Sequence, residues 1–465
     1  MDVRVKFLGG ARTVTGSKFL LEVDKFQLMI DCGLFQGLKE YRLRNWEWLP
    51  IDFFKVDAIV LTHAHLDHSG YLPRLFRSGY QGEVYCSEGT DALLDIMLKD
   101  SANLQMEEAA WAKKKGYSRH TFPRPLYDLD DVAETLPHLN PVPFGQTISL
   151  ADHIQIEFLP AGHILGAASV RITIQGDEQE KVLVFSGDIG RYDQPVMPDP
   201  TPIPKADVLF VESTYGNRLH PETPVNEDLT KVINRALSRG GSLLIPSFAV
   251  GRTQDLLYQL YHLFEKNAID RVPVYIDSPM AISVTELYRR YDHLHRLNVA
   301  EGAEEVFNHP QFRYIRSQSD STLLNDEKRS SIIISASGMC TGGRILHHLY
   351  HRLRREQDTV LFVGYQGEGT RGRDLVEGAM QVKIFGEQVP VRCTVERLDG
   401  LSAHADRNEL MRWLRNLTES PKATFVVHGE EENAKVFAQR IEEELGWNNV
   451  VVPNYLESVH LFQGI

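Results

Sequence analysis

Residues 62–68 (THAHLDH) contain three histidines and one aspartate, an unusually dense group of metal-binding side chains. They follow the apolar run Ala58–Leu61, which predicts a strand, so the group begins where a strand ends. If the loop curls, the first two histidines converge on one cation and the remaining pair faces a second position. Imidazole nitrogens and carboxylate oxygens suit Zn²⁺, with Mn²⁺ as a poorer fit. The sequence therefore predicts a metal site formed by His63, His65, Asp67 and His68.

Two further segments supply the ligands that a two-metal site needs. His163 lies in PAGH and Asp188 in FSGD, and each follows a predicted strand. Alone, either residue is more often a loop or capping residue, but the order HxHxDH, GH, SGD favours metal ligands. Asp31 also follows an early predicted strand, and from there it is placed to orient ligand histidines by hydrogen bonding.

This set of motifs resembles the metallo-β-lactamase superfamily, and the resemblance covers the whole chain. It implies an αββα sandwich whose strand ends hold a dinuclear zinc site. The resemblance assigns His63, His65 and His163 to one zinc ion, Asp67 and His68 to the other, and Asp188 to both. Members of the superfamily hydrolyse lactams, thioesters, lactones and phosphodiesters, so the fold alone does not name a substrate.

Three later motifs narrow the resemblance: Glu212 in FVESTYG, His404 in LSAHAD and His428 in VVHG. Taken singly, they are explained as an ion-pair residue, a helix N-terminal residue and a strand-end surface histidine. Together and in this order they resemble motifs A, B and C of the β-CASP branch. The resemblance implies that His428 completes the second zinc site and that Glu212 holds His404, which contacts the scissile phosphate or assists the leaving group. The implied catalytic group is His404, Glu212, Asp67 and Asp188.

A histidine in motif C is associated with the RNA-processing members of this branch, whereas the DNA-repair members typically lack it. The sequence looks closest to the nuclease subunit of the cleavage and polyadenylation specificity factor and its prokaryotic homologues. Residues 63–73, 335–339 and 364–372 carry this similarity. Because the sandwich starts at residue 1 and little chain follows His428, we expect the compact bacterial form.

The elements that position these residues fall into three stretches. Short β-rich runs dominate the first stretch, which also contains one long helical pattern at Thr90–Lys115. Strands then alternate with amphipathic helices, Ile282–Arg296 among them, which indicates a parallel sheet flanked by helices. Near Pro390 the first pattern returns. We therefore expect an α/β protein in which one domain is interrupted by another. The resemblance implies that these are an αββα sandwich (1–212 and 391–465) and an inserted β-CASP domain (213–390).

Gly- and Ser-rich strand ends in the inserted stretch predict contacts with RNA phosphates, because such turns can point backbone N–H groups at an anion. The candidate phosphate contacts are Ser337, Gly338, Arg252, Arg344 and Arg371. For the arginines, the alternative is a solvated residue at a helix start. Phe248 and Tyr365 are either base-stacking or core residues.

The 465-residue chain has 50 Lys+Arg and 63 Asp+Glu, a formal net charge of −13. A broad basic surface for nucleic acid is therefore not expected, but charge is nearly balanced between residues 216 and 392, so local RNA binding is not excluded. No apolar run reaches the ~20 residues of a membrane span, and Met1–Gly10 lacks a signal-peptide pattern. The four scattered cysteines are typical of buried thiols in a reducing, cytoplasmic setting.

We expect a zinc-dependent ribonuclease with two Zn²⁺ per chain, for which Mn²⁺ is an alternative ion. It would cut RNA internally in RNA processing or decay, with 5′→3′ trimming as a second activity. Three alternatives stay open: a DNA nuclease of the same fold, a non-catalytic RNA-binding scaffold and a small-molecule hydrolase. The complete ligand set argues against a scaffold, and the large insert argues against a small substrate. A homodimer is compatible with the sequence.

Overall fold

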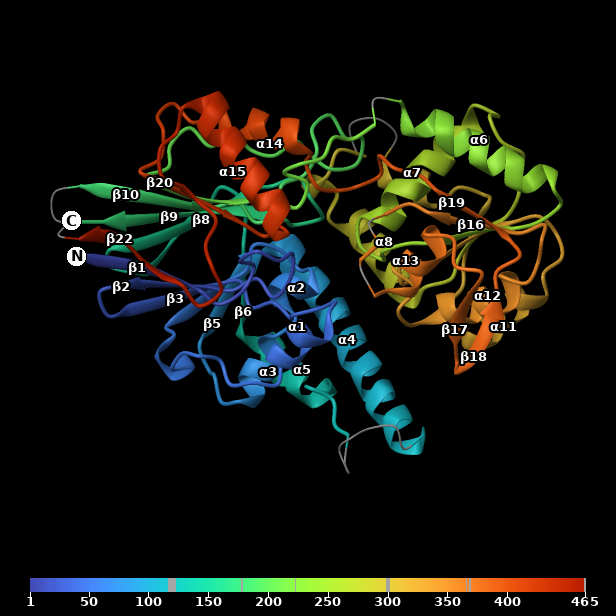
Figure 1. Cartoon of the computed structure of the whole chain (residues 1–465), viewed down its shortest axis with the longest axis horizontal. Helices are drawn as coiled ribbons and strands as arrows, with labels where there is room; N and C mark the ends of the chain where they lie inside the picture. Colours follow the sequence, from blue (N-terminus) through green and yellow to red (C-terminus); the bar gives the residue numbers. More distant parts are fainter. Residues whose placement is uncertain are drawn as a thin grey trace. The chain divides into compact units, whose positions relative to one another are not determined.

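Two compact units make up the chain. The computed structural model describes residues 1–115, 123–176, 179–221, 223–297, 302–364, 366–367 and 369–463. The first unit combines Met1–Leu219 with His404–Ile465, and the second is the inserted stretch His220–Ala403 (Figure 1). The chain therefore leaves the first unit once and returns to it, which is the organisation of an interrupted sandwich.

Two seven-stranded sheets form the first unit. The first sheet has the order β22-β1-β2-β3-β4-β5-β6, in which β3 to β6 run parallel and the others antiparallel. Its strands are β1 (Asp2–Phe7), β2 (Phe19–Val23), β3 (Phe26–Ile30), β4 (Ala58–Val60), β5 (Glu83–Ser87), β6 (Leu139–Val142) and β22 (Ser458–Gln463). The second sheet has the order β21-β20-β11-β10-β9-β8-β7. Its strands are β7 (Thr147–Ala151), β8 (Ile154–Pro160), β9 (Ala168–Gln175), β10 (Glu180–Phe185), β11 (Val208–Glu212), β20 (Ala423–Val427) and β21 (Val450–Val451).

The two sheets pack face to face because each turns alternate apolar side chains toward the other. Val5 and Phe7 of β1 are fully buried and belong to one cluster with residues of both sheets. The rings of Phe7 and Phe425 lie 5.2 Å apart, and those of Phe185 and Phe210 stack at 4.0 Å. This apolar core fixes the register of both sheets, and therefore the positions of their strand ends.

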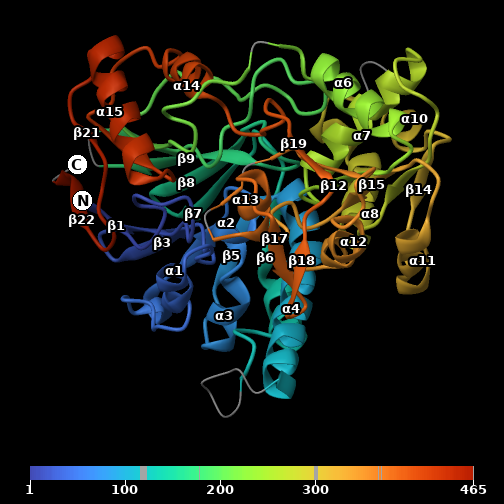
Figure 2. The ribbon, with the colours of Figure 1, turned by 45° about the vertical axis from the view of Figure 1, so that its right-hand side comes forward.

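Helices cover the outer faces of both sheets, which completes the αββα layering expected from the sequence. On the second sheet, α14 (Arg407–Leu414) and α15 (Glu431–Leu445) bury Trp413 and Phe437 against outward-facing residues such as Leu209. On the first sheet, the long helix α4 (Glu88–Lys115) contacts β5 and β6 (Figure 2). The shorter helices of this unit are α1 (Lys39–Arg44), α2 (Leu66–Ser69), α3 (Leu72–Arg77) and α5 (Leu129–Thr135), with 3₁₀ turns η1 (Phe53–Lys55) and η2 (Leu136–His138).

The second unit is built on a six-stranded sheet of order β14-β13-β15-β12-β16-β19, in which every recorded pair is parallel. Its strands are β12 (Leu243–Pro246), β13 (Val274–Ile276), β14 (Phe312–Tyr314), β15 (Ile332–Ser335), β16 (Thr359–Phe362) and β19 (Thr394–Arg397), and β17 (Gln381–Ile384) pairs with β18 (Glu387–Pro390) as a separate hairpin. The helices are α6 (Val225–Ser238), α7 (Arg252–Glu265), α8 (Pro279–Arg290), α10 (Ala303–Phe307), α11 (Gln318–Leu323), α12 (Arg344–Arg352) and α13 (Arg371–Val376), with η3 (Asp292–Leu294) and η4 (Leu324–Asp326). The parallel sheet predicted for the insert is therefore confirmed.

Two details differ from the sequence-based expectation. The helix expected over Ile282–Arg296 is wrong at its end, because Tyr291 leaves helical backbone angles (φ −105°, ψ 53°) and a short 3₁₀ turn follows. In addition, β19 pairs with β16, so the sheet of the second unit continues beyond residue 390. The compact units divide between residues 219 and 220 and between 403 and 404.

The cysteines and the helices test two expectations from the sequence, namely buried thiols and the absence of a membrane span. Cys32, Cys86, Cys340 and Cys393 are all free and buried, as predicted for thiols that act as small apolar side chains. Within the part of the chain that the structure describes, no helix has the length and apolar character needed to span a lipid bilayer.

Candidate metal centre

Each predicted ligand follows the carboxyl end of a strand in the first unit. Residues 62–68 follow β4, and His163 follows β8 after two intervening residues. Asp188 and His428 follow β10 and β20, which flank β11 as parallel neighbours. The carboxyl ends of β10, β11 and β20 therefore lie side by side at one edge of the second sheet. The loops that follow the strands bring the polar side chains together.

His63, His65 and His163 turn three ring nitrogens toward a common position. Nε2 of His63 lies 3.1 Å from Nδ1 of His65, which lies 3.3 Å from Nε2 of His163. Oδ2 of Asp188 is 3.4 Å from Nε2 of His63 and 3.6 Å from Nε2 of His163. These four side chains form one candidate metal-binding group.

Asp67, His68 and His428 form a second candidate group. Nε2 of His68 lies 3.1 Å from Nε2 of His428, which in turn lies 3.5 Å from Oδ2 of Asp67. Oδ1 of Asp188 is 3.4 Å from Nε2 of His68 and 3.1 Å from Nδ1 of His428. One carboxylate oxygen of Asp188 therefore faces each group, which is the arrangement of a bridging ligand.

The separations between these atoms fit metal coordination. In a tetrahedral zinc site with bonds of about 2.0–2.1 Å, neighbouring ligand atoms lie about 3.3 Å apart. The atoms of the first group lie 3.1 to 3.6 Å apart. Among the described residues, Oδ1 of Asp188 is buried and has no hydrogen-bond partner, a condition that a cation would relieve. The donor set of nitrogen and carboxylate oxygen is the one that Zn²⁺ takes.

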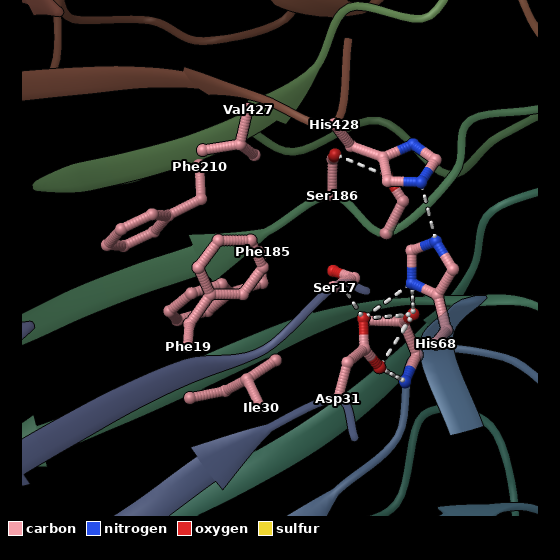
Figure 3. A pocket seen from close by; sticks show the side chains of 12 residues that line it. Ser17, Phe19, Ile30, Asp31, His68, Phe185, Ser186, Phe210, Val427 and His428 are labelled. Carbon is pink, nitrogen blue, oxygen red and sulfur yellow. Dashed lines mark hydrogen bonds and ion pairs between the residues drawn. The ribbon is translucent and has the colours of Figure 1, made fainter. Parts of the chain in front are cut away.

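Asp31 contacts a histidine of the second candidate group. Oδ2 of Asp31 is 2.7 Å from Nδ1 of His68, which leaves Nε2 of that ring directed toward His428 (Figure 3). The other oxygen accepts hydrogen bonds from the backbone N–H of Thr62 at 2.7 Å and from its hydroxyl at 3.0 Å. With these donors already in place, the Asp31 carboxylate has the position of an orienting partner of the candidate ligand His68.

Burial and neighbouring carboxylates set the protonation of the ligand histidines. Burial lowers the pKa of His63 to about 3 and that of His65 to about 4, and it lowers the pKa of His163 as well. These three imidazoles are therefore neutral at neutral pH, as metal ligation requires. Burial would also lower the pKa of His68, but the facing carboxylates, Asp188 and Asp31 foremost, raise it to about 10.

Two glycines allow the loops to approach this closely. A Cβ atom on Gly33 would lie 1.6 Å from the backbone oxygen of Asp67, so only glycine fits beside the ligand loop. Gly187, directly before Asp188, has φ +57°, and a Cβ there would lie 2.8 Å from the backbone oxygen of Ala168. A side chain at either position would displace a loop that carries a candidate ligand.

His404 lies beside the metal-binding groups. Its ring is 4.4 Å from the ring of His163, and its Nδ1 is 3.9 Å from Oδ2 of Asp188. The same nitrogen is 3.4 Å from Oε1 of Glu212. Burial alone would lower the pKa of His404, but Glu212, Asp188 and Asp67 raise it to about 9. Glu212 is therefore the foremost of the groups that favour the protonated form of the ring.

Asp188, Glu212 and His404 also meet the geometric requirement for a third metal-binding group. Glu212, however, is fully buried, and its carboxylate accepts hydrogen bonds from the backbone N–H groups of Ile189 at 2.6 Å and Thr214 at 3.3 Å. A carboxylate that already faces amide donors and a protonated ring is satisfied without a cation. This arrangement favours the holding role of Glu212.

The arginines predicted to contact phosphates have partners within the second unit. Arg344 donates to Oδ1 of Asp277 at 2.6 Å and to two backbone carbonyl oxygens, and Arg371 donates to two backbone carbonyl oxygens. Arg252 is only 7% exposed. These contacts favour a role in holding the strand-end loops rather than in binding a substrate.

Of the remaining predicted RNA contacts, Ser337 and Gly338 lie in the turn after β15, and Phe248 follows β12. The hydroxyl of Ser337 is 3.0 Å from that of Thr341, so Ser337 forms a hydrogen bond within its own turn. Phe248 is 38% exposed and packs on Gly338, where an added Cβ would lie 2.9 Å from the ring. Tyr365 lies outside the described residues.

Three polar residues at the centre have roles that the sequence analysis did not assign. The hydroxyl of Thr62 is 3.0 Å from Asp31 and 3.1 Å from Nδ1 of His63. The hydroxyl of Ser186 accepts from the backbone N–H of Glu212, and that of Thr214 is 3.3 Å from Nδ1 of His428. Each stands next to or within two residues of a motif residue, and that adjacency is the signal that could have found them.

Comparison with known families agrees with this geometry. The metallo-beta-lactamase superfamily model matches residues 13–238, the Beta-Casp domain model matches 253–375, and the Zn-dependent metallo-hydrolase RNA specificity domain model matches 388–453. The chain is also similar in fold to a protein of unknown function from Enterococcus faecalis V583, with a TM-score of 0.54, 13% identity and coverage of 99% of this chain and 100% of that one.

Curated relatives match over nearly the full length. Ribonuclease TTHA0252 of Thermus thermophilus is 37% identical over 95% of this chain and 97% of its own. The RNase J-like protein of Methanocaldococcus jannaschii is 30% identical over 98% of both chains, and transcription termination factor FttA of that organism is 31% identical over 99% of this chain and 72% of its own. Together with the interrupted sandwich and the histidine–carboxylate cluster, these matches show that the chain belongs to the β-CASP family of metal-dependent hydrolases with the metallo-β-lactamase fold.

Proposed function

We propose that this protein is a zinc-dependent ribonuclease that hydrolyses RNA phosphodiester bonds, mainly internally and with 5′→3′ trimming, in RNA processing or decay. The observation that carries the proposal is the pair of histidine groups that share Asp188, with His404 beside them and 3.4 Å from Glu212. RNA is favoured as the substrate because one relative is named a ribonuclease and another an RNase J-like protein. The matched RNA specificity domain model supports the same substrate.

Two zinc ions per chain are part of the proposal. His63, His65 and His163 would hold one ion, Asp67, His68 and His428 the other, and Asp188 both. Bound divalent cations would lower the pKa of water and offset the negative charge of the phosphodiester. The chain supplies a buried, preorganised set of ligands for them, so little reorganisation is needed when the substrate arrives.

His404 would act as the general acid. Its Nδ1 faces Glu212, so Nε2 is the nitrogen from which a proton can pass to the leaving oxygen. Glu212 keeps the ring protonated and fixes its plane, because the same carboxylate is anchored to the backbone N–H of Ile189. His404 therefore assists bond cleavage without being a metal ligand.

The experiment that tests the proposal uses the purified full chain, zinc and matched 5′-labelled RNA and DNA oligonucleotides, with His65→Ala as the inactive control. We expect internal cleavage of RNA by the wild type and none by the variant. A parallel series with Mn²⁺ identifies the preferred ion. The ribonuclease proposal fails if the wild type leaves the RNA intact across metals and pH.

The same assay separates the alternatives. Equal cleavage of the DNA oligonucleotide would indicate a nuclease without RNA selectivity. RNA binding that is undiminished in His65→Ala, with no cleavage by either protein, would indicate a scaffold. Zinc content measured alongside should be close to two ions per wild-type chain and lower in the variant, because His65 contributes to one group only.

A further inference from the structure

Glu409 closes the N-terminal cap of α14. Its Oε2 accepts a hydrogen bond from the backbone N–H of Asp406 at 2.9 Å, while Oδ1 of Asp406 accepts from the backbone N–H groups of Asn408 and Glu409 at 2.8 and 2.9 Å. This reciprocal pair is a capping box. Since Asp406 follows His404 by two residues, the cap determines where the histidine loop meets the helix.

The other oxygen of Glu409 reaches a different loop. Oε1 accepts a hydrogen bond from the backbone N–H of Tyr192 at 3.2 Å, and Oε2 lies 3.7 Å from Nε of Arg191. The Glu409 side chain is 18% exposed, so these contacts form in a largely desolvated place. A helix cap does not require either contact, because both belong to the loop that follows Asp188.

The two loops that Glu409 contacts are paired with each other. Gly190 and His404 form an isolated antiparallel bridge, and the backbone N–H of Ala405 donates to the carbonyl oxygen of Ile189 at 2.8 Å. The loop after Asp188 is held by Glu212 at Ile189 and by Glu409 at Tyr192. The backbone pairing therefore joins the loop after Asp188 to the loop that carries His404. Glu409 contacts both of these loops beside the pairing.

We propose that Glu409 is a positioning residue that sets His404 against Asp188 by clamping their two loops together. The inference rests on the proposed ribonuclease function, in which His404 protonates the leaving oxygen. A displacement of about 1 Å in such a group lowers the rate by about 10²-fold. Release of the clamp should therefore lower turnover on RNA without removing a metal ligand.

A second capping box in the chain supplies the control. At α5, Oδ2 of Asp131 accepts from the backbone N–H of Asp128 at 2.9 Å, and Oδ1 of Asp128 accepts from the backbone N–H of Asp131 at 3.2 Å. This box has the same hydrogen bonds as the box at α14. In addition, Asp131 accepts a hydrogen bond from the side chain of Arg77, whereas Glu409 accepts one from the backbone of a second loop. This box also shows that an aspartate at the third helical position is long enough to close a cap.

Three variants separate clamping from capping. Glu409→Asp keeps an acid that can cap the helix but is one methylene too short to reach both Asp406 and Tyr192. Glu409→Gln keeps the full length of the side chain but has a single acceptor oxygen, so it can accept from the backbone N–H of Asp406 or of Tyr192 but not from both. Asp131→Ala removes a cap of the same kind far along the chain. Thermal unfolding measures how each variant changes the stability of the fold, separately from its activity.

The assay measures kcat and KM on RNA and on bis(p-nitrophenyl) phosphate, whose leaving group needs no proton. For Glu409→Asp we expect kcat on RNA to fall by about 10- to 100-fold, with KM and zinc content unchanged and a smaller loss on the activated diester. Amide hydrogen exchange at residues 189–192 should quicken. Glu409→Gln should also lose activity on RNA, because one of the two loops loses its acceptor, and Asp131→Ala should match the wild type.

The inference fails if Glu409→Asp matches the wild type on RNA, or if its loss of activity follows a loss of zinc or of folded protein. It also fails if both substrates are affected equally, because the acid would then not be the group that is displaced. If the wild type cleaves no RNA, the proposed function fails instead, and hydrogen exchange still shows whether Glu409 clamps the two loops.

Discussion

Glu212 and His404 are 192 residues apart in the chain, yet Oε1 of Glu212 lies 3.4 Å from Nδ1 of His404. The Glu212 carboxylate is fully buried and the His404 ring is 22% exposed, so the carboxylate lies inside and the imidazole reaches toward solvent. In such a pair the buried carboxylate favours the charged form of the imidazole. This contact favours the protonated form of His404, which is the form that the proposed chemistry uses.

We predict that His404→Ala lowers kcat on RNA by about 10²- to 10⁴-fold, the usual contribution of a general acid. Zinc content should stay near the wild-type value, because His404 lies outside the two groups bridged by Asp188. Cleavage of bis(p-nitrophenyl) phosphate should suffer much less. Metal analysis alongside steady-state kinetics checks this, with the exposed His460→Ala as the control. Loss of zinc from His404→Ala would make the residue a ligand.

Asp31→Asn should weaken zinc binding by about 10- to 100-fold, as expected when the partner of a ligand histidine is removed. The amide would place N–H hydrogens toward Nδ1 of His68, which now lies 2.7 Å from a carboxylate oxygen. Zinc loss to a graded chelator series measures the effect. Asp57→Asn is the matched control, since Asp57 likewise accepts from a backbone N–H but at Gln27. Equal zinc retention by both variants would contradict the orienting role.

Asp277→Asn should destabilise the second unit by about 3–5 kcal/mol, the range for breaking one partner of a buried ion pair. Asp277 is fully buried and bonds to His348, Arg344 and Ser321, each at 2.6 Å. Urea unfolding at pH 7 measures the difference. Asp320→Asn, at an exposed site, is the control and should change little.

The same variant has a predicted pH dependence. Burial alone would raise the pKa of Asp277, but hydrogen bonds from His348, Ser321 and Arg344 lower it. A carboxyl group with a lowered pKa stabilises the fold above its ordinary pKa of about 3.9 and loses that contribution as pH falls through the lowered value. The gap between wild type and Asp277→Asn should therefore shrink under acid. A gap that widens below pH 4 would contradict this linkage.

RNA binding should depend weakly on salt. The net charge of −13 argues against a broad basic surface, and the arginines predicted to bind phosphates are engaged with protein groups. If about three phosphates are contacted, the slope of log K against log salt is about −2 for a single strand. Binding of labelled RNA to the His65→Ala variant across a salt series measures it. A slope of about −6 or steeper would indicate an extended cationic surface instead.

The fold class and the identity of the candidate ligands follow from the sequence because both are local properties. HxHxDH, GH, SGD and His428 stand after apolar runs, and such runs end at the edge of a sheet. Strand-and-helix alternation likewise indicates the parallel sheet of the insert. The end of α8 was not predictable in this way, because the amphipathic pattern continues past Tyr291 whereas the backbone does not.

Only the tertiary structure decides which partners each polar side chain contacts. The order of the motifs does not say that Asp188 turns one oxygen to each histidine group, nor that Glu409 bonds to two loops at once. Arg344 has the sequence context of a phosphate contact, yet its donors face Asp277 and backbone carbonyls. The physical reason is that residue type and spacing determine which groups a loop carries. The direction of a side chain, and the partner that satisfies it, depend on packing between segments hundreds of residues apart.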